Sequence, residues 1–72
     1  MSDQFELLPS DYAVVVKRRM PGNKPWKWEI WVAGRSRPVT RSEGSFATIA
    51  EATREGKAAL KTFLDEQFPS AA

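Results

Sequence analysis

The residues that could do chemistry in this chain of 72 amino acids are bases and tryptophans, because it contains no cysteine and no histidine. That composition removes thiolate nucleophiles, the usual zinc ligands and the commonest general base. Glycine-rich phosphate loops and the G-x-S-x-G nucleophile motif are also absent from the sequence. A unit of this size leaves little room for a pocket of a few hundred Å³. We therefore predict a protein that is not an enzyme and uses no cofactor or metal.

The positive charge is concentrated in the middle of the chain. Residues 12–41 contain eight bases and a single acid, Glu29, whereas residues 1–11 and 42–72 carry formal charges of −3 and −2. The net charge is only +2, so composition alone hides this basic central region.

Those bases are organised around residues 26–33, which hold all three tryptophans of the chain. Side chains of a strand alternate between its two faces. One face of this stretch is wholly apolar and carries Trp26, Trp28, Ile30 and Val32. The other face carries Lys27, Glu29, Trp31 and Ala33. This alternation is typical of a strand in an antiparallel sheet that is buried on one side.

The rest of the chain predicts an α+β fold. Strands over 12–19 and 38–42 flank the central strand in a three-stranded antiparallel meander. A helix follows from residue 49 to about residue 67, because Thr48 and Glu51 form a capping box. We expect an irregular arm over 1–11, one ββ(β)α domain over 12–68 and a frayed tail over 69–72.

The apolar stripe of the helix should pack on the apolar face of the sheet. The expected core is Val14, Val16, Trp26, Trp28, Ile30, Phe46, Ile49, Leu60, Phe63 and Leu64. Ala13 and Val15 could replace Val14 and Val16, since the first strand is apolar on both faces. Gly56 lies on the stripe, where glycine costs about 1 kcal/mol relative to alanine, and we expect it to allow close approach of the helix to Trp28.

The open face of the sheet is the candidate site. Cations there could neutralise phosphates while an aromatic ring stacks on bases, as in nucleic-acid-binding domains. The candidate residues are Lys17, Arg19, Lys27, Trp31, Arg35, Arg37 and Arg41, with Arg18 as an alternative to Lys17. The simpler interpretation is a solvated face on which Trp31 lies against the stems of long cations.

Two motifs resemble known families. The stretch 26–30 and the entry to the helix, Phe46 to Ala52, resemble the Apetala-like N-terminal arm-binding domain of tyrosine recombinases. That resemblance implies a sheet that binds the DNA major groove. Residues 26–64 are also similar to a group of short uncharacterised bacterial proteins of the same strand–strand–strand–helix order, which implies no activity. A looser similarity to HicB-type antitoxins implies a protein partner.

The expected partner is nucleic acid. The alternative is a protein-interaction module, in which the same face or a strand edge meets a protein or a second copy of the chain. We expect no small-molecule substrate and no membrane, because no apolar run approaches the roughly 20 residues of a membrane span. The first fifteen residues contain three acids and no base, unlike a secretory signal, so we expect a cytoplasmic protein of bacterial type.

Overall fold

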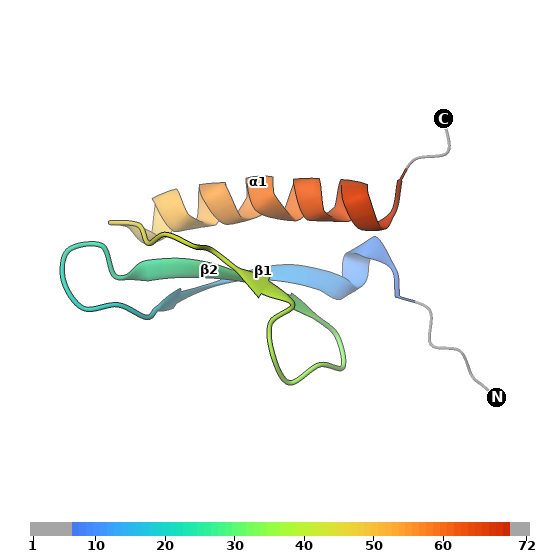
Figure 1. The fold of residues 1–72 in the computed structure, drawn as a ribbon, viewed down its shortest axis with the longest axis horizontal. Helices are drawn as coiled ribbons and strands as arrows, with labels where there is room; N and C mark the ends of the chain where they lie inside the picture. The colour runs from blue at the N-terminus through green and yellow to red at the C-terminus, as the bar shows by residue number, and fades with distance from the viewer. Residues whose placement is uncertain (1–6, 70–72) are drawn as a thin grey trace.

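Residues 7–69, which a computed structural model describes, form a short 3₁₀ turn, three strands and one helix (Figure 1). The turn is Pro9–Asp11, and the strands are β1 (Tyr12–Arg18), β2 (Trp26–Val32) and β3 (Thr40–Arg41). The helix α1 spans Ile49–Gln67. The strands form one antiparallel sheet in the order β1-β2-β3, so the predicted α+β fold with a C-terminal helix is confirmed.

The pairing of β1 with β2 decides which side chains share a face. Val14 lies opposite Ile30, and Val16 lies opposite Trp28. Directly paired residues point to the same side of a sheet, so Val14 and Val16 lie on the helix-covered face. Of the two alternatives for the first strand, the one that buries Val14 and Val16 is confirmed.

The strand β3 is shorter than the predicted strand over 38–42. Pro38 has no N–H to donate, which limits pairing at that end. Beyond the two residues of β3, the N–H groups of Val39 and Ser42 still donate to the carbonyl oxygens of Ile30 and Trp28. The chain then returns to β2, where Phe46 and Trp26 exchange two main-chain hydrogen bonds of 3.1 and 2.7 Å. The strand β2 is therefore paired on both sides.

The helix has the predicted bounds. The N–H of Glu51 donates to Thr48 Oγ1 at 3.0 Å, which satisfies one of the unpaired donors of the first turn. The Glu51 carboxylate accepts from the N–H of Ala47 at 3.3 Å, one residue before the partner expected in a capping box. At the other end, the ring of Tyr12 packs against Phe63 and Phe68, with centroids 5.3 and 5.9 Å away.

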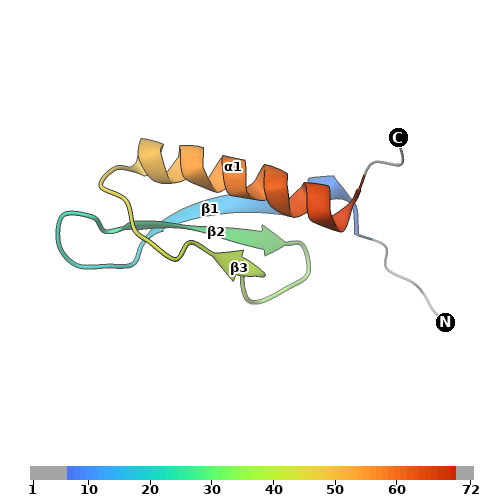
Figure 2. The ribbon, with the colours of Figure 1, turned by 45° about the horizontal axis from the view of Figure 1, so that its top comes forward.

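α1 covers one face of the sheet and runs antiparallel to β1 (Figures 1 and 2). The predicted close approach at Gly56 is confirmed. A Cβ at this position would lie 2.7 Å from Val14 Cγ1 and 2.9 Å from Trp28 Cβ. The helix therefore lies closer to the sheet here than any residue with a side chain would allow.

The core is narrower than the apolar pattern predicts. Ile30, Val32 and Ala52 are its buried apolar residues, whereas most other members of the predicted set are half-buried. The prediction for Ile49 is wrong, because this side chain is 52% exposed. Helical side chains lean toward the N-terminus of their helix. Ile49 is the first residue of α1, so no earlier turn of the helix lies beside its side chain.

Candidate functional site

The open face of the sheet, opposite α1, is built by alternate residues of all three strands. The pairing places Ala13 opposite Trp31 and Lys17 opposite Lys27. Glu29 lies opposite Val15 on one side and Arg41 on the other. The open face therefore brings together Lys17, Lys27, Trp31 and Arg41 around one carboxylate.

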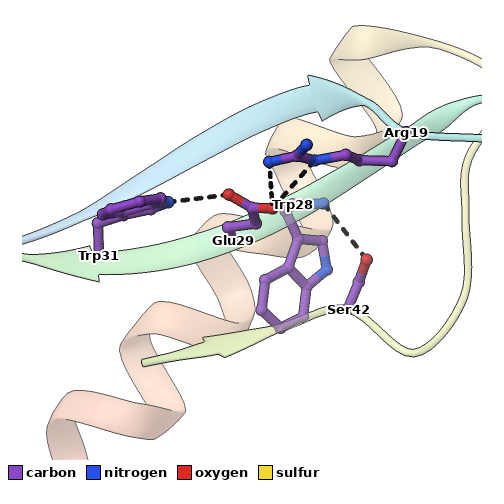
Figure 3. Close-up of polar contacts among 5 residues, drawn as sticks. All are labelled: Arg19, Trp28, Glu29, Trp31 and Ser42. Carbon is purple, nitrogen blue, oxygen red and sulfur yellow. Dashed lines mark hydrogen bonds and ion pairs between the residues drawn. The ribbon is translucent and has the colours of Figure 1, made fainter. Parts of the chain in front are cut away.

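That carboxylate, Glu29, is the most unusual group on this face. The residue is only 1% exposed, although no helix of residues 7–69 covers this side of the sheet. Trp31 Nε1 donates to Glu29 Oε1 at 2.9 Å. Arg19 reaches the other oxygen, Oε2, from its Nε at 3.3 Å and its Nη2 at 3.2 Å (Figure 3). Three donor groups from two side chains thus surround the carboxylate.

The pKa of Glu29 reports the balance of two opposing effects. Burial removes water from the carboxylate and so raises its pKa. The hydrogen bond from Trp31, the charge and hydrogen bond of Arg19 and the charge of Lys17 all favour the ionised form. These interactions outweigh burial, and the pKa lies below its ordinary value. Glu29 is therefore a carboxylate at neutral pH and holds its donors in place.

Trp31 is fixed from two directions. Its N–H is bound to Glu29, and Lys17 Nζ lies 5.4 Å from the centroid of its ring. A cation at this distance is attracted to the ring face. Trp31 is consequently half-buried rather than fully exposed.

Of the two candidates from the first strand, Lys17 lies on the open face. Arg18 lies opposite Trp26 on the other face, with its Cζ 6.0 Å from that ring's centroid.

Three of the predicted site residues lie at the surface beside this cluster. Arg41 is exposed on β3, and Arg35 and Arg37 are exposed in the loop from β2 to β3. Gly34 opens that loop with φ +86°, a conformation that favours glycine, and the loop extends to the side of the sheet away from α1 (Figure 1). Within residues 7–69, none of these arginines forms an ion pair.

Lys27 differs from them, because its Nζ donates to the main-chain oxygen of Glu43 at 3.3 Å. The other predicted residues divide into two groups. Lys17, Arg19 and Trp31 are organised around Glu29. Arg35, Arg37 and Arg41 keep their charges available to solvent.

The charge is also divided between the two layers of the fold. Residues 12–48, which form the sheet and its loops, contain eight bases and two acids. α1 contains three bases and four acids. The positive charge of residues 12–67 therefore lies in the sheet layer, and α1 carries a slight excess of acids.

Sequence reasoning missed an open hollow of about 480 Å³ on the other side of the sheet, so the expectation of no pocket this large is wrong. It lies between the β3 side of the sheet and α1, where Glu55 and Ala59 face Trp28 and Phe46. The buried hydroxyl of Ser42 on its wall accepts from the N–H of Trp28 at 3.3 Å and donates to the carbonyl of Gly44 at 2.8 Å. No local sequence pattern predicts this hollow, because residues far apart in the sequence form it.

Comparison of the chain with protein-family models, curated proteins and solved structures gives no match. The resemblances drawn from its motifs therefore stay predictions. In the part of the chain described here, no helix is long and apolar enough to cross a membrane. Residues 7–69 also contain no cluster of three acidic residues that could hold a metal ion.

Proposed function

We propose that this protein is a non-catalytic module that binds nucleic acid through the open face of its sheet. The observation that carries the proposal is the arrangement around Glu29. One buried carboxylate holds Trp31 and Arg19 in place, and Arg35, Arg37 and Arg41 stand exposed beside them.

Electrostatics supports this function over a purely solvated face. Phosphates of a nucleic-acid backbone attract Lys and Arg whatever the base sequence, and counterion release makes such binding salt-dependent. The sole acid on the three strands is buried and already paired with Arg19, so it presents little negative charge to an approaching phosphate.

The aromatic residue has a matching role. A ring held at fixed orientation loses little conformational entropy when a base or sugar packs against it. Trp31 is held by Glu29 and Lys17 before any ligand arrives. We infer that the three exposed arginines provide the affinity and that Trp31 provides an apolar contact on the same side of the sheet.

The test is a fluorescence-anisotropy titration of the full chain with a mixed-sequence DNA duplex at several salt concentrations. The variant replaces Arg35, Arg37 and Arg41 with alanine, which removes three charges but none of the groups that donate to the Glu29 carboxylate. Because each lost phosphate contact removes about 0.9 from the slope of log K against log salt, we expect the slope to fall by about 2–3. The matched control, R54A/K57A/K61A, removes the same charge from α1 and should bind like the parent protein.

The titration also identifies the surface. In NMR spectra of labelled protein, duplex should shift the signals of Trp31, Arg37 and Arg41 at low salt and not at high salt. No binding at low salt, or equal losses in the two triple variants, would rule out the proposed face.

A further inference from the structure

The strand β1 forms one edge of the sheet, and its outer side carries unpaired main-chain groups. The carbonyl of Asp11 accepts from the N–H of Ala33, and the N–H of Arg19 donates to Pro25. In an antiparallel ladder the direction of these groups alternates along the strand. The main-chain groups of Val14, Val16 and Arg18 therefore point away from β2, and no other strand within residues 7–69 pairs with them.

The first five residues of this edge strand lack the features that usually prevent strands from pairing. Natural edge strands are commonly very short, or are interrupted by proline, a bulge or a charge. The opposite edge of the sheet fits that description, because β3 has only two residues. β1 has seven residues, and from Tyr12 to Val16 it contains no charge and no proline.

We propose that two copies of the chain associate through antiparallel pairing of their β1 strands, which makes one continuous six-stranded sheet. The occupant of the edge is thus a second copy, and the symmetry axis passes through Val15. In this register Val14 of one copy pairs with Val16 of the other, and their outward N–H and C=O groups face each other.

The charges along β1 are self-complementary in this register. Asp11, at the start of the strand, comes opposite Arg19 of the other copy, just beyond its end. Ala13 comes opposite Lys17. A shift of the axis toward the end of the strand would instead bring Lys17 opposite Lys17, and like charges directly opposite destabilise a sheet.

The position of the helix also fits this assembly. α1 packs on both β1 and β2, and at Gly56 it lies against Val14 of one strand and Trp28 of the other. With strands about 4.8 Å apart, a helix midway between these two strands would lie about 5 Å from the symmetry axis, which would put the two helices about 10 Å apart. Packed helices in proteins are separated by 8–10 Å, so the two copies of α1 would lie side by side in contact.

The side of α1 that would face α1 of the second copy carries half-buried side chains. Glu55 and Ala59 border the hollow and so mark the β3 side of α1. At 3.6 residues per turn, Thr53, Leu60 and Leu64 lie on the opposite flank, toward the free edge of β1. These three side chains are half-buried in the single copy and would lose further exposed surface on pairing.

The first experiment is sedimentation equilibrium of the full chain without nucleic acid, combined with amide hydrogen exchange by NMR at low and high protein concentration. We expect a dimer whose formation raises protection at Val14, Val16 and Arg18. Protection at Val15 and Lys17, whose N–H groups face β2, should not depend on concentration. A monomer throughout the range up to millimolar concentration would overturn the proposal.

A pair of substitutions at the exposed Ala13 tests the register. A13E places a carboxylate opposite Lys17 of the other copy, whereas A13K places a second cation there. Since the contact occurs twice in the dimer, the dissociation constant should fall roughly two- to tenfold for A13E and rise by a similar factor for A13K. Equal constants for the two variants would overturn the register.

A stronger perturbation is V16P, because proline removes an outward N–H and leaves the ladder to β2 intact. We expect a folded monomer, and a folded V16P dimer would contradict pairing through this edge. If V16P fails to fold, the Ala13 pair still decides the question. The outcome is independent of nucleic-acid binding, because Arg35, Arg37 and Arg41 lie outside β1, and a monomer that binds the duplex would leave the proposed function standing.

Discussion

The two faces of the sheet are ordered by different interactions. On the covered face, α1 packs against Ile30 and lies so close at Gly56 that no side chain fits between the layers. On the open face, no second layer is present within residues 7–69, and the long side chains of Arg19 and Trp31 bury the carboxylate of Glu29 instead. The first face depends on shape and the second on charge, so mutations and pH should affect them differently.

The largest expected effect is on the covered face, at Ile30. This side chain is fully buried, and truncating a buried isoleucine to alanine typically costs about 2–5 kcal/mol. A domain of this size has a stability of only a few kcal/mol. We therefore expect I30A to be largely unfolded at 25 °C by circular dichroism.

A matched pair of valines compares the two faces directly. Val32 is buried on the covered face, and Val15 is half-buried on the open face. In urea denaturation V32A should lose more free energy of unfolding than V15A. Equal losses would mean that the open face is packed as tightly as the covered one.

The next largest effect is expected at Gly56. Replacing glycine by alanine inside a helix normally stabilises it by about 1 kcal/mol. Here the new Cβ would lie within 3 Å of Val14 and Trp28, and overpacking typically costs about 1–3 kcal/mol. G56A should therefore be less stable than the parent protein in urea denaturation.

Gly44 supplies the control for that substitution. No atom lies within 4 Å of the position that a Cβ would occupy at Gly44. G44A should thus leave the free energy of unfolding unchanged or raise it slightly, because it restricts the unfolded chain. A stabilised G56A would show that the layers can separate at little cost.

The same contrast explains what could be predicted from the sequence. Alternation along 26–33 predicts which side chains lie under the helix, and Thr48 with Glu51 predicts where the helix begins. Gly56 predicts a close approach of the helix to the sheet, because glycine is costly in a helix interior. Each of these features is set by periodicity or by neighbours within a turn, and the structure confirms each of them.

The features that escaped prediction depend on contacts between distant segments. Glu29 looks like an ordinary solvated residue on the open face, and only the fold brings Arg19, ten residues earlier, onto its carboxylate. The hollow beside Ser42 depends on the path of the chain between β3 and α1.

A pH titration probes the open face alone. The pKa of Glu29 lies below its ordinary value of 4.5 in the folded protein, so its ionised form stabilises the fold. That contribution is present above about pH 4.5 and is lost as the pH falls through the lower folded-state pKa. We expect E29Q to be less stable than the parent at pH 7, with the difference shrinking on acidification.

Urea denaturation of both proteins between pH 7 and pH 3 measures this difference. I30V, which perturbs only the covered face, should differ from the parent by the same amount at every pH. A constant difference for E29Q would show that the carboxylate contributes through packing and not through its charge.

The smallest effect is expected at Lys17, whose ammonium group lies over the ring of Trp31. A contact of this kind at a partly exposed site contributes about 0.5–1 kcal/mol. Lys17 also lies opposite Lys27, and two like charges in that position repel each other. K17Q should therefore lose less than 1 kcal/mol, since it gives up the ring contact but relieves the repulsion. K27Q relieves the same repulsion without touching Trp31, but it also gives up the hydrogen bond from Lys27 Nζ to the main-chain oxygen of Glu43, so its stability in urea denaturation should stay close to that of the parent. The contact with the ring is read from the indole N–H signal of Trp31 in NMR, which should move only in K17Q. If both variants behave alike, Glu29 alone holds Trp31, and the order of the open face depends on one carboxylate.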